Sequence, residues 1–252
     1  MKFSLITATY NSLSSIHFVL DSVKKQTHKE IEWIIVDGSS TDGTLDYIKE
    51  NEHLIDKYVS EKDNGIYDAL NKGIKMASGD IIGFLHSDDF LASSGIIASI
   101  NEAFNKKPVD GVYGDLEYVE KENTHKVVRY WKSKIFKPDL LNEGWMPAHP
   151  TVFLKREVYL KHGFFNTDLK ISADYDFMLR IFNDQSLSFV YLPQLITKMR
   201  VGGASNRNLK NIIQKSKEDL WALRANKISY PYKALMTKNF SKISQFVKKN
   251  KD

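Results

Sequence analysis

The 252-residue chain contains no cysteine. This absence excludes a disulfide framework, a thiolate nucleophile and a zinc site built on thiolates. No apolar run approaches the roughly 20 residues that a membrane-spanning helix needs, and the segment Met1–Thr7 lacks the apolar stretch of a signal peptide. We therefore expect a cytoplasmic protein that does not span a bilayer.

The body of the chain also lacks an excess of charge of one sign. The net charge is +5, but twelve Lys and Arg residues against three acidic ones lie from Arg207 to Asp252, which leaves 24 basic and 28 acidic residues in the first 206. Because that body has no basic stripe and no recognisable nucleic-acid module, we expect no nucleic-acid partner. Hydrophobic residues make up 42% of the chain, which is enough to fill a globular core.

Strand and helix patterns alternate through the first hundred residues. Apolar and β-branched runs predict strands at 2–8, 31–36, 55–60 and 81–85. Apolar residues at helical spacing predict helices over 13–23, after Thr41 as a cap, and over 66–76. This alternation predicts an α/β protein with a mostly parallel sheet.

The alternation loosens beyond Leu91, where we expect antiparallel strands. The pattern predicts helices over 94–104, from about Ala173, and over 208–225 and 232–247; the predicted strands are 111–119, 126–131, 189–192 and 195–201. With no repeat and no low-complexity linker, the predicted organisation is one domain, residues 1–206, followed by a basic helical extension, residues 207–252.

Two adjacent carboxylates, Asp88 and Asp89, follow the strand pattern at 81–85. Ligands of open α/β sheets bind beyond the carboxyl ends of the strands, and Mg²⁺ and Mn²⁺ take carboxylate and phosphate oxygens. Adjacent carboxylates also repel each other and commonly need a cation, although capping of the next helix would explain them too. The pair suggests nucleotide chemistry with a divalent metal.

Further polar residues stand at strand ends and helix starts. Thr7–Ser12 forms a turn that suits a phosphate or base, and Asp37 closes a strand where a carboxylate can bind a base or ribose. Asp63, Asn64 and Gly65 precede a helix, where capping and nucleotide contact are both open. Taken one at a time, these residues are equally explained as ordinary turns and caps.

Asp174 opens a later helix near the N-cap or first position. Capping would explain it, and a general base would look no different in the sequence. Asp68 and Lys72 are i and i+4 neighbours on a predicted helix, so an ion pair explains them without any function.

In their order, these stretches resemble the family 2 glycosyltransferases, whose catalytic domain has the GT-A fold, and the relatives that build bacterial cell-surface polysaccharides. The resemblance covers roughly residues 3–203. The motifs that carry it are Leu5–Asn11, Val36–Thr44, Asp63–Gly65, Ala69–Gly73, His86–Asp89, His149–Phe153, Asp174–Arg180 and Arg200–Ser205.

The resemblance implies a Rossmann-like central sheet flanked by helices, with a small antiparallel portion. It also implies inverting transfer of a hexosyl or N-acetylhexosaminyl group from a nucleoside-diphosphate sugar, most simply a UDP-sugar, to a glycan or polyprenyl-diphosphate-linked acceptor. Asp174 would be the base, and Asp88, Asp89 and His86 would hold Mn²⁺ or Mg²⁺. The implied donor-binding residues are Thr7, Ala8, Thr9, Tyr10, Asp37, Asp63, Asn64, Gly65, Asn71, Ser87, Asp88 and Arg200.

The chain departs from the family pattern at two positions. His86 stands where the metal motif begins with an acid, and imidazole prefers transition metals to Mg²⁺. Either His86 contributes to a manganese site, or it contacts the nucleotide while the two aspartates hold the cation. Ala173 replaces an acid before the base, and Asp176 is a second candidate base. A sugar nucleotidyltransferase and a catalytically silent sugar-nucleotide-binding protein remain alternatives.

The C-terminal segment has the pattern of an amphipathic basic helix. Apolar residues fall on one face and lysines on another: Met236, Phe240, Ile243 and Val247 against Lys238, Lys242 and Lys249. Anionic headgroups attract such helices, so we expect peripheral contact with the inner face of the membrane. The alternative is packing on its own domain or on a second subunit in a homodimer.

Overall fold

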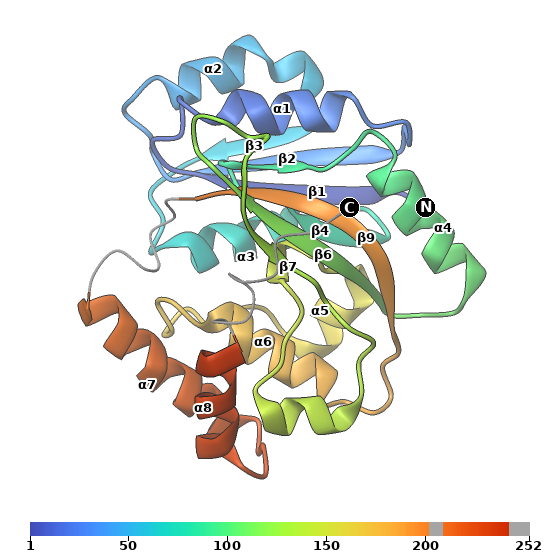
Figure 1. The fold of residues 1–252 in the computed structure, drawn as a ribbon. Coiled ribbons are helices and arrows are strands. Elements are labelled where there is room, and N and C mark those ends of the chain that lie inside the picture. The colour runs from blue at the N-terminus through green and yellow to red at the C-terminus, as the bar shows by residue number, and fades with distance from the viewer. Residues whose placement is uncertain (202–208, 242–252) are drawn as a thin grey trace.

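The computed structural model describes residues 1–201 and 209–241 of the chain, and within them helices cover both faces of a central sheet (Figure 1). The strands are β1 (Phe3–Thr9), β2 (Ile31–Asp37), β3 (Lys57–Ser60), β4 (Ile81–Phe84), β5 (Asp89–Leu91), β6 (Gly111–Val119), β7 (Val127–Trp131), β8 (Phe153–Lys155) and β9 (Phe189–Arg200). The α-helices are α1 (Ile16–Lys24), α2 (Thr44–Glu50), α3 (Ile66–Met76), α4 (Ile96–Lys106), α5 (Arg156–His162), α6 (Ala173–Phe182), α7 (Leu209–Ala225) and α8 (Pro231–Ser241). Three short 3-10 helices complete the elements: η1 (Glu52–Leu54), η2 (Pro138–Glu143) and η3 (His149–Thr151).

The sheet has a parallel half and a mixed half. Its strand order is β3-β2-β1-β4-β8-β6-β9-β5, with β7 paired to β6. The first four strands pair in parallel, β8 pairs antiparallel with both β4 and β6, and β5 pairs antiparallel with β9. The predicted fold class, a mostly parallel α/β sheet with an antiparallel portion, is confirmed.

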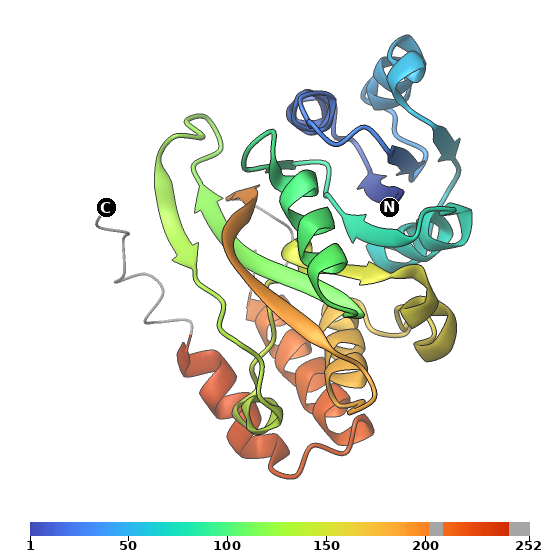
Figure 2. The same cartoon turned by 90° about the vertical axis from the view of Figure 1, so that its right-hand side faces the viewer.

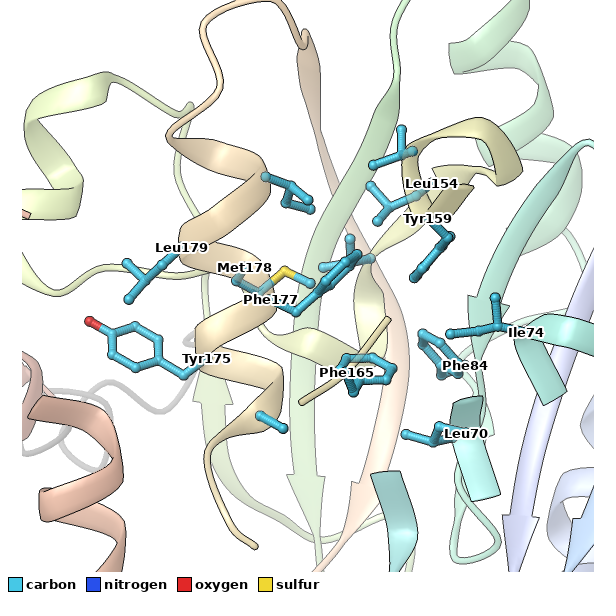
Figure 3. Packing of buried hydrophobic residues seen from close by; sticks show 14 of the residues in the cluster. Leu70, Ile74, Phe84, Leu154, Tyr159, Phe165, Tyr175, Phe177, Met178 and Leu179 are labelled. Carbon is cyan, nitrogen blue, oxygen red and sulfur yellow. The ribbon is translucent and has the colours of Figure 1, made fainter. Parts of the chain in front are cut away.

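The parallel strands are apolar runs because both of their faces are covered. All seven residues of β1 are buried. One apolar cluster joins α3, α5 and α6 to the sheet, and Figure 3 shows Phe84, Tyr159, Phe165 and Phe177 within it. The Tyr159 and Phe177 rings stack with centroids 5.0 Å apart. This packing sets α6 across from the carboxyl half of β4.

Several predicted boundaries were wrong. A single strand, β9, replaces the two predicted strands, and β5 and α5 were not predicted as elements. Helix α2 begins at Thr44 after Gly43, whose φ of 95° is left-handed, so Thr41 is not its cap. Asp42 instead accepts a hydrogen bond from the Thr44 backbone N–H at 3.0 Å.

The C-terminal helices lie on the opposite side of the molecule from α1 and α2 (Figure 2). Ala222, Leu223 and Ala234 belong to the same apolar cluster as α6. Among the described residues, no helix is both long and apolar enough to cross a membrane. The predicted continuation of the last helix to residue 247 lies outside the described residues, and the boundary between residues 206 and 207 stays a prediction.

Helix α8 is oriented differently from the prediction. Lys238 was expected on an exposed basic face, but it is 6% exposed and pairs with Asp219 at 2.8 Å. Met236 and Phe240 are 61% and 65% exposed. The lysine faces inward because a buried carboxylate is there to pair with it.

A buried carboxylate joins the elements at the amino edge of the sheet. Glu32 on β2 is 2% exposed and accepts hydrogen bonds from Ser4 Oγ at 2.6 Å and from Ser78 N and Oγ at 2.9 and 2.7 Å. Lys57 Nζ lies 2.9 Å from Glu32 Oε1. Burial alone would raise the pKa of Glu32, but these partners outweigh it and hold that pKa far below its usual range.

We expect Glu32→Gln to lower the free energy of unfolding by about 3 kcal/mol, because it leaves Lys57 and several donors without the buried anion that they share. The lowered pKa means that Glu32 stabilises the fold above its ordinary pKa near 4.5 and loses that contribution as the pH falls. Stability of the variant should thus depend less on pH in the acid range. Urea unfolding at several pH values measures both effects, with the exposed Glu30→Gln as the control; equal midpoints for the two variants would contradict the assignment.

Candidate functional site

Loops after β1, β2 and β4 meet at the carboxyl edge of the parallel strands. Cα pairing aligns Thr9 with Asp37, so the ends of β1 and β2 are level. Asn11 accepts a hydrogen bond from Thr41 N at 2.9 Å, and Ser12 Oγ donates to Ser87 Oγ at 2.9 Å. The predicted segments are therefore brought together by hydrogen bonds between the loops.

Asp37 is the centre of this loop network. It is fully buried, and its oxygens accept hydrogen bonds from Thr9 Oγ1 at 2.9 Å, Ser60 Oγ at 2.6 Å, Ser40 N at 3.0 Å and the Ser40 hydroxyl. Four donors satisfy the carboxylate, so contact with a ligand would have to displace one of them. In this arrangement Asp37 shapes the edge by holding three loops.

The end of β1 at Thr9 separates the four predicted residues there into buried and exposed ones. Thr7 is fully buried and accepts a hydrogen bond from Trp33 Nε1 at 3.0 Å. Ala8 and Thr9 are 9% and 2% exposed, whereas Tyr10 is 67% exposed. Of these four side chains only the Tyr10 ring is exposed to a ligand. The Thr7 and Thr9 hydroxyls form hydrogen bonds with the buried side chains of Trp33 and Asp37.

Asp63 reaches back over the β2 loop. A side-chain carbon at Gly38 would lie 2.5 Å from Asp63 Oδ2 and 3.3 Å from Tyr10 Cδ2, so a larger residue there would displace the Asp63 carboxylate. Asp63 Oδ1 also accepts a hydrogen bond from Gly65 N at 2.9 Å, where a φ of 113° precedes α3. The Asp63 carboxylate and the Tyr10 ring thus flank the same stretch of backbone, while Asn64 lies exposed beside it.

The structure separates the predicted carboxylate pair. Asp88 is half-buried, but Asp89 is fully buried at the start of β5. Burial and the charge of Asp88 raise the pKa of Asp89 well above its usual range. Within the described chain neither Asp89 oxygen has a hydrogen-bond partner. Asp89 is therefore more deeply buried than Asp88, and its role as a metal ligand stays a prediction.

His86 is influenced by the charges of two candidate acids, Asp88 and Asp174. Burial lowers the pKa of His86, while the charges of Asp88 and Asp174 act in the opposite direction. The His86 Nδ1 atom is buried without a partner in the described residues. Asp88 on the β4 loop and Asp174 on α6 thus act on one imidazole from two different elements.

The residues at the end of β4 fit a cation that a ligand helps to coordinate. No group of three or more His, Asp or Glu side chains in the described residues could hold a metal alone. Mg²⁺ commonly takes only one or two carboxylates, with substrate phosphates and water completing its octahedron. Half-buried Asp88 offers one such carboxylate, and the Nδ1 atom of His86 and both oxygens of Asp89 are buried without a hydrogen-bond partner among the described residues.

Asp174 stands in the first turn of α6. Ser172 is the N-cap, so Asp174 is the second residue of the helix and not its cap or first residue as predicted. The Tyr67 hydroxyl lies 3.1 Å from Asp174 Oδ1 and 2.8 Å from the Ile171 carbonyl oxygen. Asp174 is half-buried, so its carboxylate keeps access to the site.

Asp176, the other candidate base, has a structural role. It is 3% exposed and forms an ion pair with Arg180. Its Oδ1 accepts a hydrogen bond from Asn226 Nδ2 at 2.8 Å. Both oxygens are engaged in the interior, and this leaves Asp174 as the accessible carboxylate of α6.

Asn71 and Arg200, two predicted donor-binding residues, are held by backbone groups. The Asn71 amide donates to Phe165 O at 2.9 Å and accepts from Phe165 N at 3.0 Å. Arg200 is 5% exposed, and its Nε and Nη2 donate to Lys121 O at 3.0 and 2.7 Å. These contacts occupy the Asn71 amide and two of the three Arg200 nitrogens, while Arg200 Nη1 is buried without a hydrogen-bond partner among the described residues. The part of the Arg200–Ser205 motif from residue 202 onward lies outside the described residues.

Sequence reasoning missed Tyr67 and gave no role to His149. His149 is 7% exposed, and its ring centroid lies 5.7 Å from that of His86 and 5.3 Å from that of Phe84. Burial lowers the pKa of His149 to about 4, so the ring is neutral at pH 7. The His-Pro pair was the only signal for His149; nothing in the pattern of α3 distinguishes Tyr67 from a core aromatic.

Comparison with known proteins places this geometry in context. The family model described as Glycosyl transferase family 2 matches residues 4–164. A PGL/p-HBAD biosynthesis glycosyltransferase of Mycobacterium bovis is 30% identical over 211 residues, covering 81% of this chain and 79% of that protein. An uncharacterized glycosyltransferase of Mycobacterium tuberculosis is 31% identical over 186 residues, covering 70% and 67%.

Solved structures share the fold. S. aureus TarS 1-349 in complex with UDP-GlcNAc superposes with a TM-score of 0.72 at 18% identity, over 96% of this chain and 73% of that one. The mannosyltransferase PcManGT from Pyrobaculum calidifontis, in complex with GDP-Man and Mn²⁺, gives 0.65 at 19% identity, over 95% and 69%. The chain spans 41% of a longer TarS chain.

The Phe165 backbone bonds to both the nitrogen and the oxygen of the Asn71 side-chain amide. We therefore expect Asn71→Ala to lower the free energy of unfolding by about 2 kcal/mol. The exposed Asn64→Ala is the matched control and should leave stability nearly unchanged. Equilibrium urea denaturation measures both. An Asn71 variant as stable as its control would show that this amide is not needed by the fold.

Proposed function

The chain belongs to glycosyl transferase family 2, and on that premise we propose that it transfers a sugar from a UDP-sugar to a hydroxyl of a glycan or lipid-linked acceptor, with inversion at the anomeric carbon. The observation that carries the proposal is that two half-buried carboxylates, Asp88 after β4 and Asp174 in the first turn of α6, are close enough to His86 for both charges to act on it. On this proposal Asp88 would serve the leaving group and Asp174 the acceptor. The solved relatives with UDP-GlcNAc and GDP-Man support a nucleoside-diphosphate sugar as donor.

The nucleoside would bind over the ends of β1 and β2. The exposed Tyr10 ring offers a face on which a base can stack. Asp63, beside the same Gly38 backbone, offers carboxylate oxygens to ribose hydroxyls. Asp37 would act indirectly, because its four hydrogen bonds keep the loops that carry these groups in place.

The diphosphate would lie beside the β4 loop. Asp88 and His86 would hold a divalent cation there, which when bound stabilises the negative charge that develops on the departing diphosphate. Ser87, hydrogen-bonded to Ser12 across the strand ends, keeps the β4 loop against the β1 loop.

Asp174 would act as the general base. As the acceptor oxygen bonds to the anomeric carbon, its proton passes to the Asp174 carboxylate and the bond from that carbon to the diphosphate oxygen breaks on the opposite face. The Tyr67 hydroxyl, 3.1 Å from Asp174 Oδ1, orients the carboxylate. One displacement inverts the carbon, so no protein nucleophile is required.

A role in surface polysaccharide synthesis would require access to a lipid-linked acceptor. The described part of α8 supports this, because Tyr232, Met236 and Phe240 are each more than 60% exposed. The sequence after α8 contains four more lysines: Lys242, Lys248, Lys249 and Lys251. We propose that this face contacts an anionic membrane surface, where aromatic side chains and lysines bind together.

We expect Asp174→Asn to reduce transfer about 10²- to 10⁴-fold while donor binding is kept, because only proton removal is lost. Asp88→Ala should instead abolish the metal-dependent part of donor binding. Release of nucleoside diphosphate from UDP-, GDP- and dTDP-sugars, with and without Mn²⁺, measures turnover, and calorimetric titration with UDP measures binding. Exposed Asp168→Asn is the control.

Three results of that experiment would contradict the proposal. Normal turnover by Asp174→Asn would show that Asp174 is not the general base. Release of pyrophosphate would indicate nucleotidyl transfer. Binding without any product would favour a silent sugar-nucleotide-binding protein.

We expect the double substitution Met236→Ser and Phe240→Ser to reduce co-sedimentation with vesicles of phosphatidylcholine and phosphatidylglycerol several-fold. Leu160→Ser, which removes an apolar side chain 66% exposed on α5, should leave it unchanged. Equal sedimentation of all three proteins would rule out the α8 face. Light scattering without vesicles tests whether a second copy of the chain covers this face instead.

A further inference from the structure

One carboxylate of the C-terminal helical extension holds the turn that enters α6. Glu218 on α7 accepts hydrogen bonds from three consecutive backbone N–H groups: Lys170 N lies 3.1 Å from its Oε1, and Ile171 N and Ser172 N lie 2.8 and 2.9 Å from its Oε2. Unpaired N–H groups gather at a helix N-terminus, and an anion there is stabilised by the helix dipole as well. Glu218 therefore holds the turn that leads into α6, including the N–H of its N-cap Ser172, from a helix 46 residues away in sequence.

The same turn is held from its other side by Tyr67. The Tyr67 hydroxyl lies 2.8 Å from the Ile171 carbonyl oxygen, while the Ile171 N–H bonds to Glu218. Asp174 follows two residues after the Ser172 N-cap and bonds to the same hydroxyl. The charges of Asp174 and Glu218 both raise the pKa of Tyr67, in addition to its burial, so the three groups are close neighbours. The turn cannot shift without breaking one of these bonds.

Glu218 is itself fixed in place. Gln214 Nε2 donates to its Oε1 at 2.9 Å. The next residue, Asp219, is 1% exposed and pairs with Lys215 at 3.2 Å and with Lys238 of α8 at 2.8 Å. Lys238 Nζ also lies 3.0 Å from the centre of the Tyr175 ring, on α6 directly after Asp174. Cation–π and ionic contacts in the interior thus lock α7, α8 and α6 together.

We infer that Glu218 is a positioning residue for the base Asp174, so that the helical extension completes the active site. This inference rests on the proposed function. An error of about 1 Å in the placement of a catalytic group can cost 10²-fold in rate. Removing Glu218 leaves three backbone donors without an acceptor, and the turn that carries Asp174 is free to rearrange. Donor binding at the ends of β1, β2 and β4 should not change, because none of those loops bonds to Glu218.

The test compares Glu218→Ala and Glu218→Gln with the native chain and with Glu102→Ala, a control on α4 whose side chain is 64% exposed. The assay measures release of nucleoside diphosphate from whichever of the UDP-, GDP- and dTDP-sugars the native chain turns over. We expect its kcat to fall about 10- to 100-fold, with no change in the Kd for UDP. Glu218→Gln, which keeps one acceptor oxygen, should recover part of the loss. In the Asp174→Asn background, Glu218→Ala should cost far less, because the base that it positions is already absent.

Normal kcat in both Glu218 variants would overturn the inference. So would equal losses in the native and Asp174→Asn backgrounds, or a parallel loss of UDP binding, since either indicates a purely structural role. If Glu218→Ala does not fold, Glu218→Asp, which keeps the charge but shortens the side chain by one methylene, should fold with reduced kcat; normal kcat in that variant counts against the inference. If the native chain releases no nucleoside diphosphate from any donor, that result contradicts the proposed function itself and is distinct from a failure of the inference about Glu218.

Discussion

Parallel pairing of β1 with β2 and β4 is the constraint on which the site depends. It places three strand ends at one edge of the sheet, and each of these strands is followed by a loop with polar side chains. Asp37 then converts this proximity into a fixed arrangement, because one buried carboxylate accepts hydrogen bonds from residues on β1, the β2 loop and β3. A buried carboxylate with all its donors present is rigid, since each lost bond exposes a desolvated charge.

Burial divides the acidic residues into two groups. Asp37, Asp89, Asp176 and Asp219 are almost fully buried, and all but Asp89 are engaged by donors or lysines that organise the fold. Asp63, Asp88 and Asp174 keep partial exposure. Under the proposed function, the second group would meet the external ligand, and the first group holds the elements that carry these residues.

Local pattern was enough to predict most of the parallel half of the fold. The strands at 2–8 and 31–36 and the helix at 66–76 were correct within two residues, because apolar periodicity reflects burial directly. The same periodicity could not predict features that depend on contacts between residues far apart in the sequence. Strand β5 is three residues long and exists through its pairing with β9. The interior position of Lys238 depends on Asp219, and the roles of Asn71 and Glu218 depend on backbone groups more than forty residues away.

The two ends of β2 have different tasks. Glu32, near its start, joins the amino edge of the sheet, whereas Asp37, at its end, organises the loops of the site. Four residues of apolar strand, 33–36, separate the amino-edge anchor from the edge that carries the candidate site. Loop sequences at the carboxyl edge can therefore diverge during evolution without eroding the amino-edge network, and a scaffold of this kind can be retargeted to new sugars while its folding requirements stay the same.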